Sequence, residues 1–344
     1  EFGITDIHTG YASTGIVALI EGQSKGRTIG LRADMDALPI KENTGKSYSS
    51  KNEGVMHACG HDGHTAMLLG AARYLSETRN FSGRAALIFQ PDEEATGGAE
   101  AMVEEGILQK FEIEEVYALH NTPSHDFGIM YTRPGPIMAG EDSFHVDIHG
   151  KGGHAAYPHE VRDPIIAAIS IAQGFQTIVS RNNIPSDDLV ISITQIHSGT
   201  TDNVIPETAF LNGTVRTFDL SVQELVIERM EKIVSGLSMS FEVDAQLNYK
   251  KGYPPTINHE KETKFAVEVA KEICGPEKVL TSVGKEMGAE DFSYMLQKRP
   301  GAYLFLGIGK RAGLHNPNYD FNDEASPIGA SFFARLIEKA LPLE

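Results

Sequence analysis

The sequence of 344 residues is longer than one hydrophobic core usually supports and is sufficient for two domains. Its 41% hydrophobic and 22% charged residues are typical of a globular protein and exclude a disordered chain. A net charge of −17 repels phosphate backbones and anionic membranes, so we expect neither nucleic acid nor a membrane as a partner.

The cysteine content and the opening of the chain bear on its compartment. Two cysteines, Cys59 and Cys274, do not make a disulfide framework, which fits a reducing environment. No apolar run approaches the ~20 residues of a membrane helix. The chain opens "EFGITDIHTG", without a charged segment followed by an apolar one, although removal of a signal peptide would leave the same opening. We expect a cytoplasmic protein.

The first 138 residues alternate short apolar runs with helical patterns, which is typical of an α/β sheet covered on both faces. We expect strands at 15–22, 27–34, 84–90, 114–120 and 127–132, and helices at 62–79 and 97–106.

The pattern changes after the Pro/Gly-rich segment "TRPGPIMAGED", which predicts a domain boundary. Over residues 139–250 we expect strands at 142–150, 188–199, 208–218 and 240–249, and helices at 163–181 and 221–237. A capping box of Ser221 and Glu224 is expected to open the last helix. This order, βαββαβ, is the ferredoxin-like split motif.

The α/β pattern returns after "GYPPTIN" and includes a strand in "AYLFLGIG". We therefore predict one α/β domain in two sequence pieces, residues 1–138 and 251–344. A small α+β domain, residues 139–250, would be inserted between them.

The stretch "GVMHACGHDGHTAM" places Cys59 and His61 at the start of a predicted helix, flanked by His57 and His64. Taken alone, it is consistent with accidental loop histidines or with a cysteine acting as a small buried hydrophobe. The next segment, "FQPDEEATGG", offers Glu93 and Glu94 directly after a strand, where a solvated acidic loop is the ordinary alternative.

Three further strands end in residues of the same kinds. Asp34 and Asp36 follow one strand, His120 ends another, and His315 follows a third. Ligands of open α/β sheets bind at the carboxyl ends of the strands, so these side chains are expected to converge.

Cysteine, histidine and carboxylate side chains gathered at one edge of a sheet are typical of a metal site. Five ligands exceed what one tetrahedral zinc ion requires, whereas two metal ions that share a water match that number. A carboxylate beside them would move the proton of the attacking water, and either Glu93 or Glu94 could serve. Thiolate, imidazole and carboxylate suit zinc, manganese, cobalt or nickel.

Six ordered motifs across nearly the whole chain resemble the M20 metallopeptidases, within them the amidohydrolase branch that includes hippurate hydrolases and N-acetyldiaminopimelate deacetylases. The motifs are "LRADMDALPI", "MHACGHDGHTAMLLGAA", "FQPDEE", "GKGGHAAYPH", "GTTDNVIPETAFLNGTVRTF" and "MGAEDFSYM". The resemblance implies an α/β/α catalytic domain with an inserted ferredoxin-like dimerisation domain. It also implies a few dozen residues, forming a helix, ahead of the point where this sequence opens.

The resemblance further implies roles for individual residues. Glu93 would be the general base, and Asp36 would orient a ligand or polarise the site. Many M20 peptidases have a metal-binding histidine where Asp34 stands, and Cys59 would complete the ligand set here. Two divalent metal ions, manganese or zinc with cobalt and nickel as further options, would be held by Cys59, His61, Glu94, His120 and His315.

The inserted domain is also given a role by the resemblance. His154 would reach the active site of the partner in a homodimer (or a dimer of dimers) and bind the oxyanion, while Asn203 and Arg216 would bind the substrate's carboxylate or oxyanion. The implied reaction is hydrolysis of N-acyl amino acids such as hippurate. An M20-type dipeptidase or aminopeptidase, a thiol hydrolase with Cys59 as nucleophile, and an inactive homologue are the alternatives.

Overall fold

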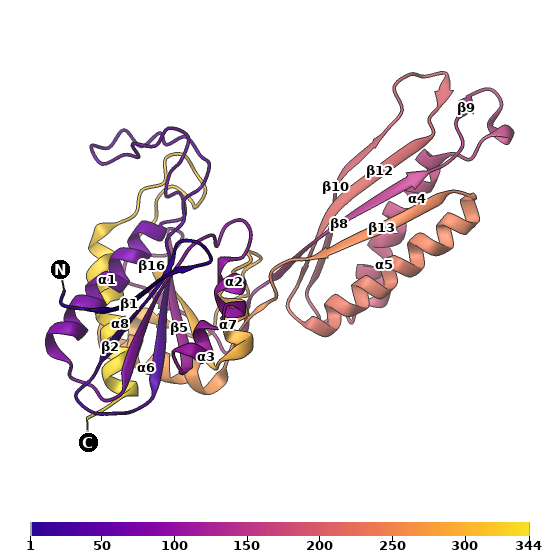
Figure 1. Cartoon of the computed structure of the whole chain (residues 1–344). Coiled ribbons are helices and arrows are strands. Elements are labelled where there is room, and N and C mark those ends of the chain that lie inside the picture. The colour runs from indigo at the N-terminus through magenta and orange to yellow at the C-terminus, as the bar shows by residue number, and fades with distance from the viewer. Residues whose placement is uncertain (1, 344) are drawn as a thin grey trace. The chain divides into compact units, whose positions relative to one another are not determined.

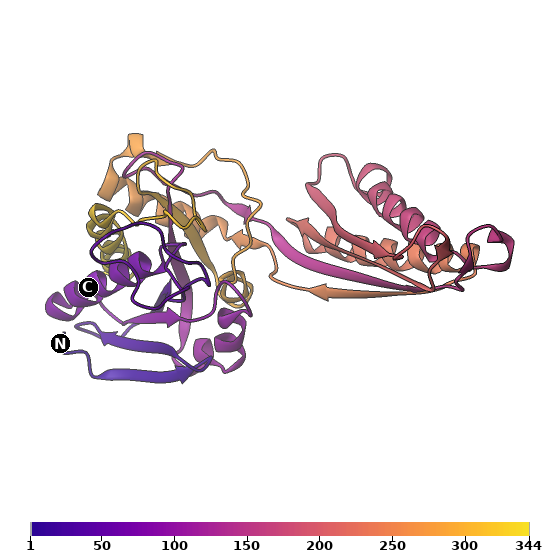
Figure 2. The same ribbon diagram turned by 90° about the horizontal axis from the view of Figure 1, so that it is seen from above.

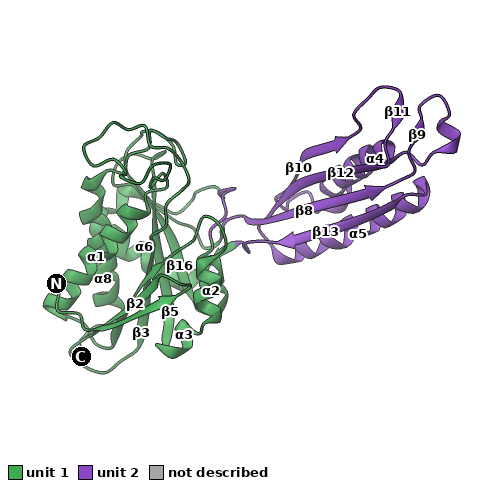
Figure 3. Ribbon diagram, turned by 45° about the horizontal axis from the view of Figure 1, so that its top comes forward, with its two compact units in different colours: residues 1–137, 256–285, 291–344 green, residues 138–255, 286–290 purple. Residues whose placement is uncertain are grey.

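The computed structural model describes residues 2–343, which form two compact units. Unit 1 contains residues 2–137, 256–285 and 291–343. Unit 2 contains residues 138–255 and 286–290, as the colours of Figure 3 indicate. Among residues 2–343, no helix combines the length and the apolar character needed to cross a bilayer.

Unit 1 is built on an eight-stranded sheet of order β1-β2-β4-β3-β5-β16-β6-β15. Four neighbouring strands, β4, β3, β5 and β16, run parallel to one another, so their carboxyl ends share one edge of the sheet. Nearly every residue of these four strands is buried, because helices cover both faces of the sheet. The strands are β1 (Asp6–Tyr11), β2 (Gly15–Glu21), β3 (Thr28–Asp34), β4 (Arg84–Gln90), β5 (Ile113–Thr122), β6 (Met130–Tyr131), β15 (Val279–Leu280) and β16 (Gly301–Gly307).

The helices of unit 1 form a layer on each face of this sheet (Figure 1; Figure 2 shows the same ribbon from above). On one face, α1 (His61–Thr78) and α6 (Glu260–Cys274) pack against α8 (Ser326–Ala340). On the other face lie α2 (Gly98–Glu104), α3 (Ile107–Lys110) and α7 (Ser293–Lys298). The α/β class expected for this part of the chain is confirmed.

Unit 2 has the element order β8-α4-β10-β12-α5-β13 and one antiparallel sheet of order β10-β12-β8-β13. Both helices pack on the same face, so buried and accessible residues alternate along β8. The elements are β8 (Gly140–His149), α4 (Pro164–Thr177), β10 (Leu189–Ser198), β12 (Thr208–Thr217), α5 (Leu220–Phe241) and β13 (Asp244–Lys251). The short strands β9 (Gly153–His154) and β11 (Val204–Ile205) pair with each other.

The remaining short elements connect the larger ones. They are β7 (Gly135–Met138), η1 (Pro158–Glu160), the π-turn η2 (Ile178–Asn182), β14 (Thr256–Asn258), η3 (Pro276–Lys278) and η4 (Asp323–Ala325).

Three local expectations were wrong or incomplete. Ser221 does not cap α5: the cap is Asp219, whose Oδ1 accepts hydrogen bonds from both the backbone N–H and the hydroxyl of Ser221, at 2.7 Å each. The strand expected at 127–132 is reduced to the two residues of β6. Strand β1, at the sheet edge, was not expected because its residues are half or fully exposed and show no apolar alternation.

Candidate metal centre

The five expected ligands all belong to unit 1 and lie at one edge of its sheet. His120 is on β5, Glu94 follows β4 and His315 follows β16, three strands whose carboxyl ends share that edge. Cys59 and His61 lie where the loop after β3 enters α1. Parallel strand pairing is therefore what brings together ligands from distant parts of the sequence.

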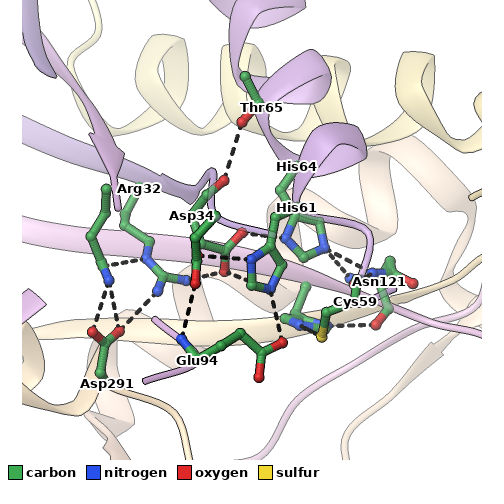
Figure 4. Close-up of polar contacts among 12 residues, drawn as sticks. Arg32, Asp34, Cys59, His61, His64, Thr65, Glu94, Asn121 and Asp291 are labelled. Atoms are coloured by element: carbon green, nitrogen blue, oxygen red, sulfur yellow. Dashed lines mark hydrogen bonds and ion pairs between the residues drawn. The ribbon is translucent and has the colours of Figure 1, made fainter. Parts of the chain in front are cut away.

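One group of possible ligand atoms comes from Cys59, His61 and Glu94, all within 4.8 Å of one another (Figure 4). The Nδ1–H of His61 donates to Oδ1 of Asp36 at 3.0 Å, and Oδ2 of Asp36 accepts from the backbone N–H of Glu94 at 3.1 Å. Asp36 thus joins the segments that carry His61 and Glu94. It also fixes the orientation of the imidazole, leaving Nε2 as the ring atom directed at the group.

The other two histidines approach the same group. Nε2 of His120 lies 3.5 Å from Sγ of Cys59, and Nε2 of His315 lies 3.1 Å from Oε1 of Glu94. His120 donates its Nδ1–H to the carbonyl of Asn121 at 2.6 Å, so its Nε2 carries the lone pair that faces the sulfur.

Charge in this buried region favours a cation. Burial raises the pKa of the Cys59 thiol well above its usual value, and neighbouring carboxylates, chiefly Glu94, raise it further. Burial lowers the pKa of His61, but the charges of Asp34 and Asp36 outweigh burial and raise that pKa to about 9. A thiol binds metal only as a thiolate, and a bound cation would stabilise the thiolate among these carboxylates.

One buried nitrogen among the expected ligands is free to bind a metal ion. Among residues 2–343, the buried Nε2 of His61 has no hydrogen-bond partner, although it lies 3.8 Å from a carboxylate oxygen of both Asp34 and Glu94. A buried polar atom without a partner is costly unless a ligand satisfies it. Sulfur, imidazole nitrogen and carboxylate oxygen together suit a divalent ion of borderline softness.

Asp34 belongs to a second group of possible ligand atoms, with His61, His64 and His120, and its carboxylate also makes two hydrogen bonds. Its Oδ2 accepts from Nη1 of Arg32 at 2.7 Å and its Oδ1 from Nδ1 of His64 at 2.5 Å. Arg32 also binds Oδ1 of Asp291 at 3.0 Å and the side-chain oxygen of Gln90 at 2.7 Å. Arg32, Gln90 and Asp291 lie in three of the motifs quoted above, but they were assigned no role, because the local sequence does not show that they bond to one another.

Glu93, the expected general base, is 7% exposed and immediately precedes Glu94. Burial acts to raise the pKa of the Asp36 carboxyl, but the hydrogen bond and charge of His61, together with the backbone N–H groups of Glu94 and Glu93, lower that pKa overall. The loop after β4 is therefore held against the loop that carries Asp36.

The three remaining expected residues lie in unit 2. His154 and Asn203 are close together, since the backbone N–H of Ala155 donates to the carbonyl of Asn203 at 3.1 Å. His154 is exposed, and its Nδ1 accepts from the backbone N–H of Ala156 at 3.1 Å. Nη2 of Arg216, on β12, lies 3.1 Å from Oε1 of Glu141.

The chain is similar to proteins of known family along almost its whole length. A family model described as peptidase family M20/M25/M40 matches residues 30–339. The hippurate hydrolase of Campylobacter jejuni is 39% identical over 341 residues, which cover 99% of this chain and 88% of the relative. The N-acetyl-L-cysteine deacetylase of Bacillus subtilis is 43% identical over 321 residues, covering 93% and 76%.

A solved structure agrees with these matches. The crystal structure of a Bacillus subtilis protein described as a dinuclear metal-binding peptidase from the M20 family matches with a TM-score of 0.86 and 33% identity. The match covers 99% of this chain and 88% of that one.

Proposed function

Because this chain belongs to peptidase family M20/M25/M40, we propose that it is a metal-dependent amidohydrolase that cleaves the amide bond of N-acyl amino acids. The observation that carries the proposal is the group formed by Cys59, His61 and Glu94, with the buried Nε2 of His61 lacking any hydrogen-bond partner within residues 2–343. The names of the relatives, a hippurate hydrolase and an N-acetyl-L-cysteine deacetylase, support the substrate class.

We propose that two divalent ions, manganese or zinc with cobalt or nickel as further options, bind to Cys59, His61, Glu94, His120 and His315. When bound, they would polarise the scissile carbonyl and lower the pKa of water. The dinuclear centre named for the Bacillus subtilis structure supports the number of ions.

Glu93 is the proposed general base. It lies beside the ligand Glu94 and is almost fully buried, so its carboxylate is kept from bulk water. In this role it takes a proton from the attacking water and delivers it to the nitrogen of the leaving amino acid. Asp36 holds His61 and the loop of Glu93 in place through the contacts already described.

Unit 2 is proposed to be a ferredoxin-like dimerisation domain. Its element order and its strand order support this assignment. In a homodimer, or a dimer of dimers, the exposed His154 would donate a hydrogen bond to the oxyanion formed at the partner's site. Asn203 and Arg216 would bind the substrate's oxyanion or carboxylate, with Arg216 exchanging its contact with Glu141 for the substrate.

This assignment divides the chain into a catalytic domain in two pieces, near residues 1–138 and 251–344, and the inserted domain near 139–250. We further propose that the enzyme acts in the cytoplasm on small molecules and not on nucleic acid, in keeping with its net charge of −17.

The test is hydrolysis of a substrate panel by chelator-treated protein, with and without added manganese or zinc. The panel contains hippurate, N-acetyl amino acids, N-acetyldiaminopimelate, indole-acetyl amino acids and unblocked dipeptides. We expect metal-restored cleavage of blocked amino acids. Cleavage of unblocked dipeptides alone would assign a dipeptidase instead, and activity that survives complete metal removal and is lost on alkylation would assign a thiol hydrolase.

A further inference from the structure

Asn121, which is outside the proposed ligand set, contacts both of the segments that carry Cys59 and His120. It lies on β5 and is fully buried. Its side-chain Nδ2 donates to the backbone carbonyl of Cys59 at 2.6 Å (Figure 4). The backbone carbonyl of Asn121 accepts the Nδ1–H of His120 at 2.6 Å. One residue therefore bonds directly to a loop that carries one ligand and to the side chain of another.

The backbone of Asn121 is itself held in place by His64. The N–H of Asn121 donates to Nε2 of His64 at 2.9 Å, so the proton of this imidazole is on Nδ1, which donates to Asp34 at 2.5 Å. Both ring nitrogens of His64 therefore make hydrogen bonds, one to Asp34 and one to the backbone of Asn121. The series Asp34–His64–Asn121–His120 links the buried Asp34 to the ring orientation of a proposed ligand.

The amide of Asn121 is oriented by Tyr319 and by the space at Gly60. The hydroxyl of Tyr319 donates to Oδ1 of Asn121 at 2.8 Å, which turns Nδ2 toward Cys59. A Cβ added at Gly60 would lie 2.4 Å from this hydroxyl and 2.5 Å from Nδ2 of Asn121. The residue between the two ligands Cys59 and His61 thus has no room for a side chain because the amide occupies that space.

We infer that Asn121 is a positioning residue that sets the separation and orientation of Cys59 and His120 for metal binding. The inference rests on the proposed function in that it takes these two residues as ligands. Cys59 lies in a loop, whereas His120 belongs to a central strand, so their spacing is not set by a shared element. The carboxamide supplies the donor for the loop, and its peptide supplies the acceptor for the imidazole.

The experiment compares Asn121→Ala with a matched control, Asn258→Ala, in the chelator-treated full chain. Asn258 is also a buried asparagine of unit 1, and its Nδ2 donates to the hydroxyl of Thr132 and to the carbonyls of Arg133 and Tyr303, none of which is a proposed ligand. Two measurements are made with Co²⁺ alone: affinity in competition with a chromophoric chelator, and the thiolate-to-cobalt charge-transfer band, which reports the bond to Cys59.

We expect Asn121→Ala to bind Co²⁺ about 10- to 100-fold more weakly than the wild type, with a reduced charge-transfer band. Asn258→Ala is expected to lower thermal stability and to retain wild-type affinity and band. Tyr319→Phe removes only the hydroxyl that orients the amide, so it is the second variant if Asn121→Ala does not fold, with an expected loss of several-fold.

Three results would overturn the inference. The first is wild-type affinity and an unchanged band in Asn121→Ala, or in Tyr319→Phe where that variant replaces it. The second is an equal loss of affinity in Asn258→Ala, which would trace the effect to general destabilisation. The third is a wild-type protein that binds no metal. Of the three results, only this one would also overturn the proposed function.

Discussion

Nε2 of His61 and Oε1 of Glu94 lie 3.8 Å apart, and this nitrogen has no hydrogen-bond partner within residues 2–343. The other ring nitrogen of His61, Nδ1, donates a hydrogen bond to the carboxylate of Asp36. The same carboxylate accepts a hydrogen bond from the backbone N–H of Glu94. The imidazole and the carboxylate are thus held near each other by a third residue, and the atom left without a partner is the one that a cation would bind.

Asp36→Ala is expected to weaken metal binding about 10- to 100-fold, because it frees the His61 ring and the Glu94 loop together. The measurement is metal affinity by chelator competition. Asp62→Ala is the matched control, since Asp62 is an exposed acid directly after His61 on α1. Equal affinities for Asp36→Ala and the wild type would contradict the proposed positioning by Asp36.

Glu93→Gln is expected to lower kcat about 10²- to 10⁴-fold while the metal content stays at the wild-type level, because an amide cannot accept the proton of the attacking water. Metal analysis and steady-state kinetics on the same preparation separate the two effects. Glu94→Gln is the comparison, and it should lose metal as well as activity. A Glu93→Gln variant with wild-type kcat would exclude Glu93 as the base.

Gly60→Ala and Gly106→Ala separate backbone strain from the collision with Asn121. Both glycines precede a helix with a φ of 83°, so alanine at either position should cost about 1–2 kcal/mol of stability. Only the added Cβ at Gly60 meets other atoms, the hydroxyl of Tyr319 and the amide of Asn121.

Gly60→Ala should therefore be less stable than Gly106→Ala and should also bind metal at least about 10-fold more weakly. Thermal denaturation and chelator competition measure the two quantities. Identical losses of stability and identical metal affinities in the two variants would show that Tyr319 and Asn121 move away from the added Cβ without loss of stability or of metal binding.

Arg32→Met is expected to destabilise the metal-free protein by about 3–5 kcal/mol, because it leaves two buried carboxylates, Asp34 and Asp291, without the guanidinium that lies between them. Arg73→Ala, which removes an exposed ion pair with Glu77 on α1, should cost less than about 1 kcal/mol. Denaturant unfolding measures both. A small loss in both variants would mean that Arg32 contributes little net stability.

Mixing His154→Ala with Glu93→Gln tests whether His154 acts on the partner's site. Each variant alone should be nearly inactive, whereas random exchange of subunits forms mixed dimers with one intact site and recovers about one quarter of wild-type activity. Activity is followed after mixing under conditions that allow exchange, with each variant alone as control. Mixed dimers as inactive as both parents would argue against action across the dimer.

Local sequence patterns were sufficient to predict the main strands and to show that ligand-type residues stand at their ends. Strands β3, β4, β5 and β16 are continuous apolar runs, and burial on both faces requires such runs wherever they pack. The ends of these strands carry the ligand-type residues, and parallel pairing brings those ends together. The exposed strand β1 shows no apolar alternation and was not predicted, and the capping-box match at Ser221 pointed two residues past the actual cap of α5, Asp219.

Only the tertiary structure decided which residues hold the ligands in place. Asn121 adjoins His120 on a strand, where neighbouring side chains point to opposite faces, so sequence alone would direct it away from the site. Its partner Tyr319 is 198 positions away along the chain, and Asp291 is 259 positions from Arg32. Hydrophobic periodicity acts over a few residues and can be read from the local sequence, whereas these hydrogen bonds form only after the strands have paired and the loops have packed.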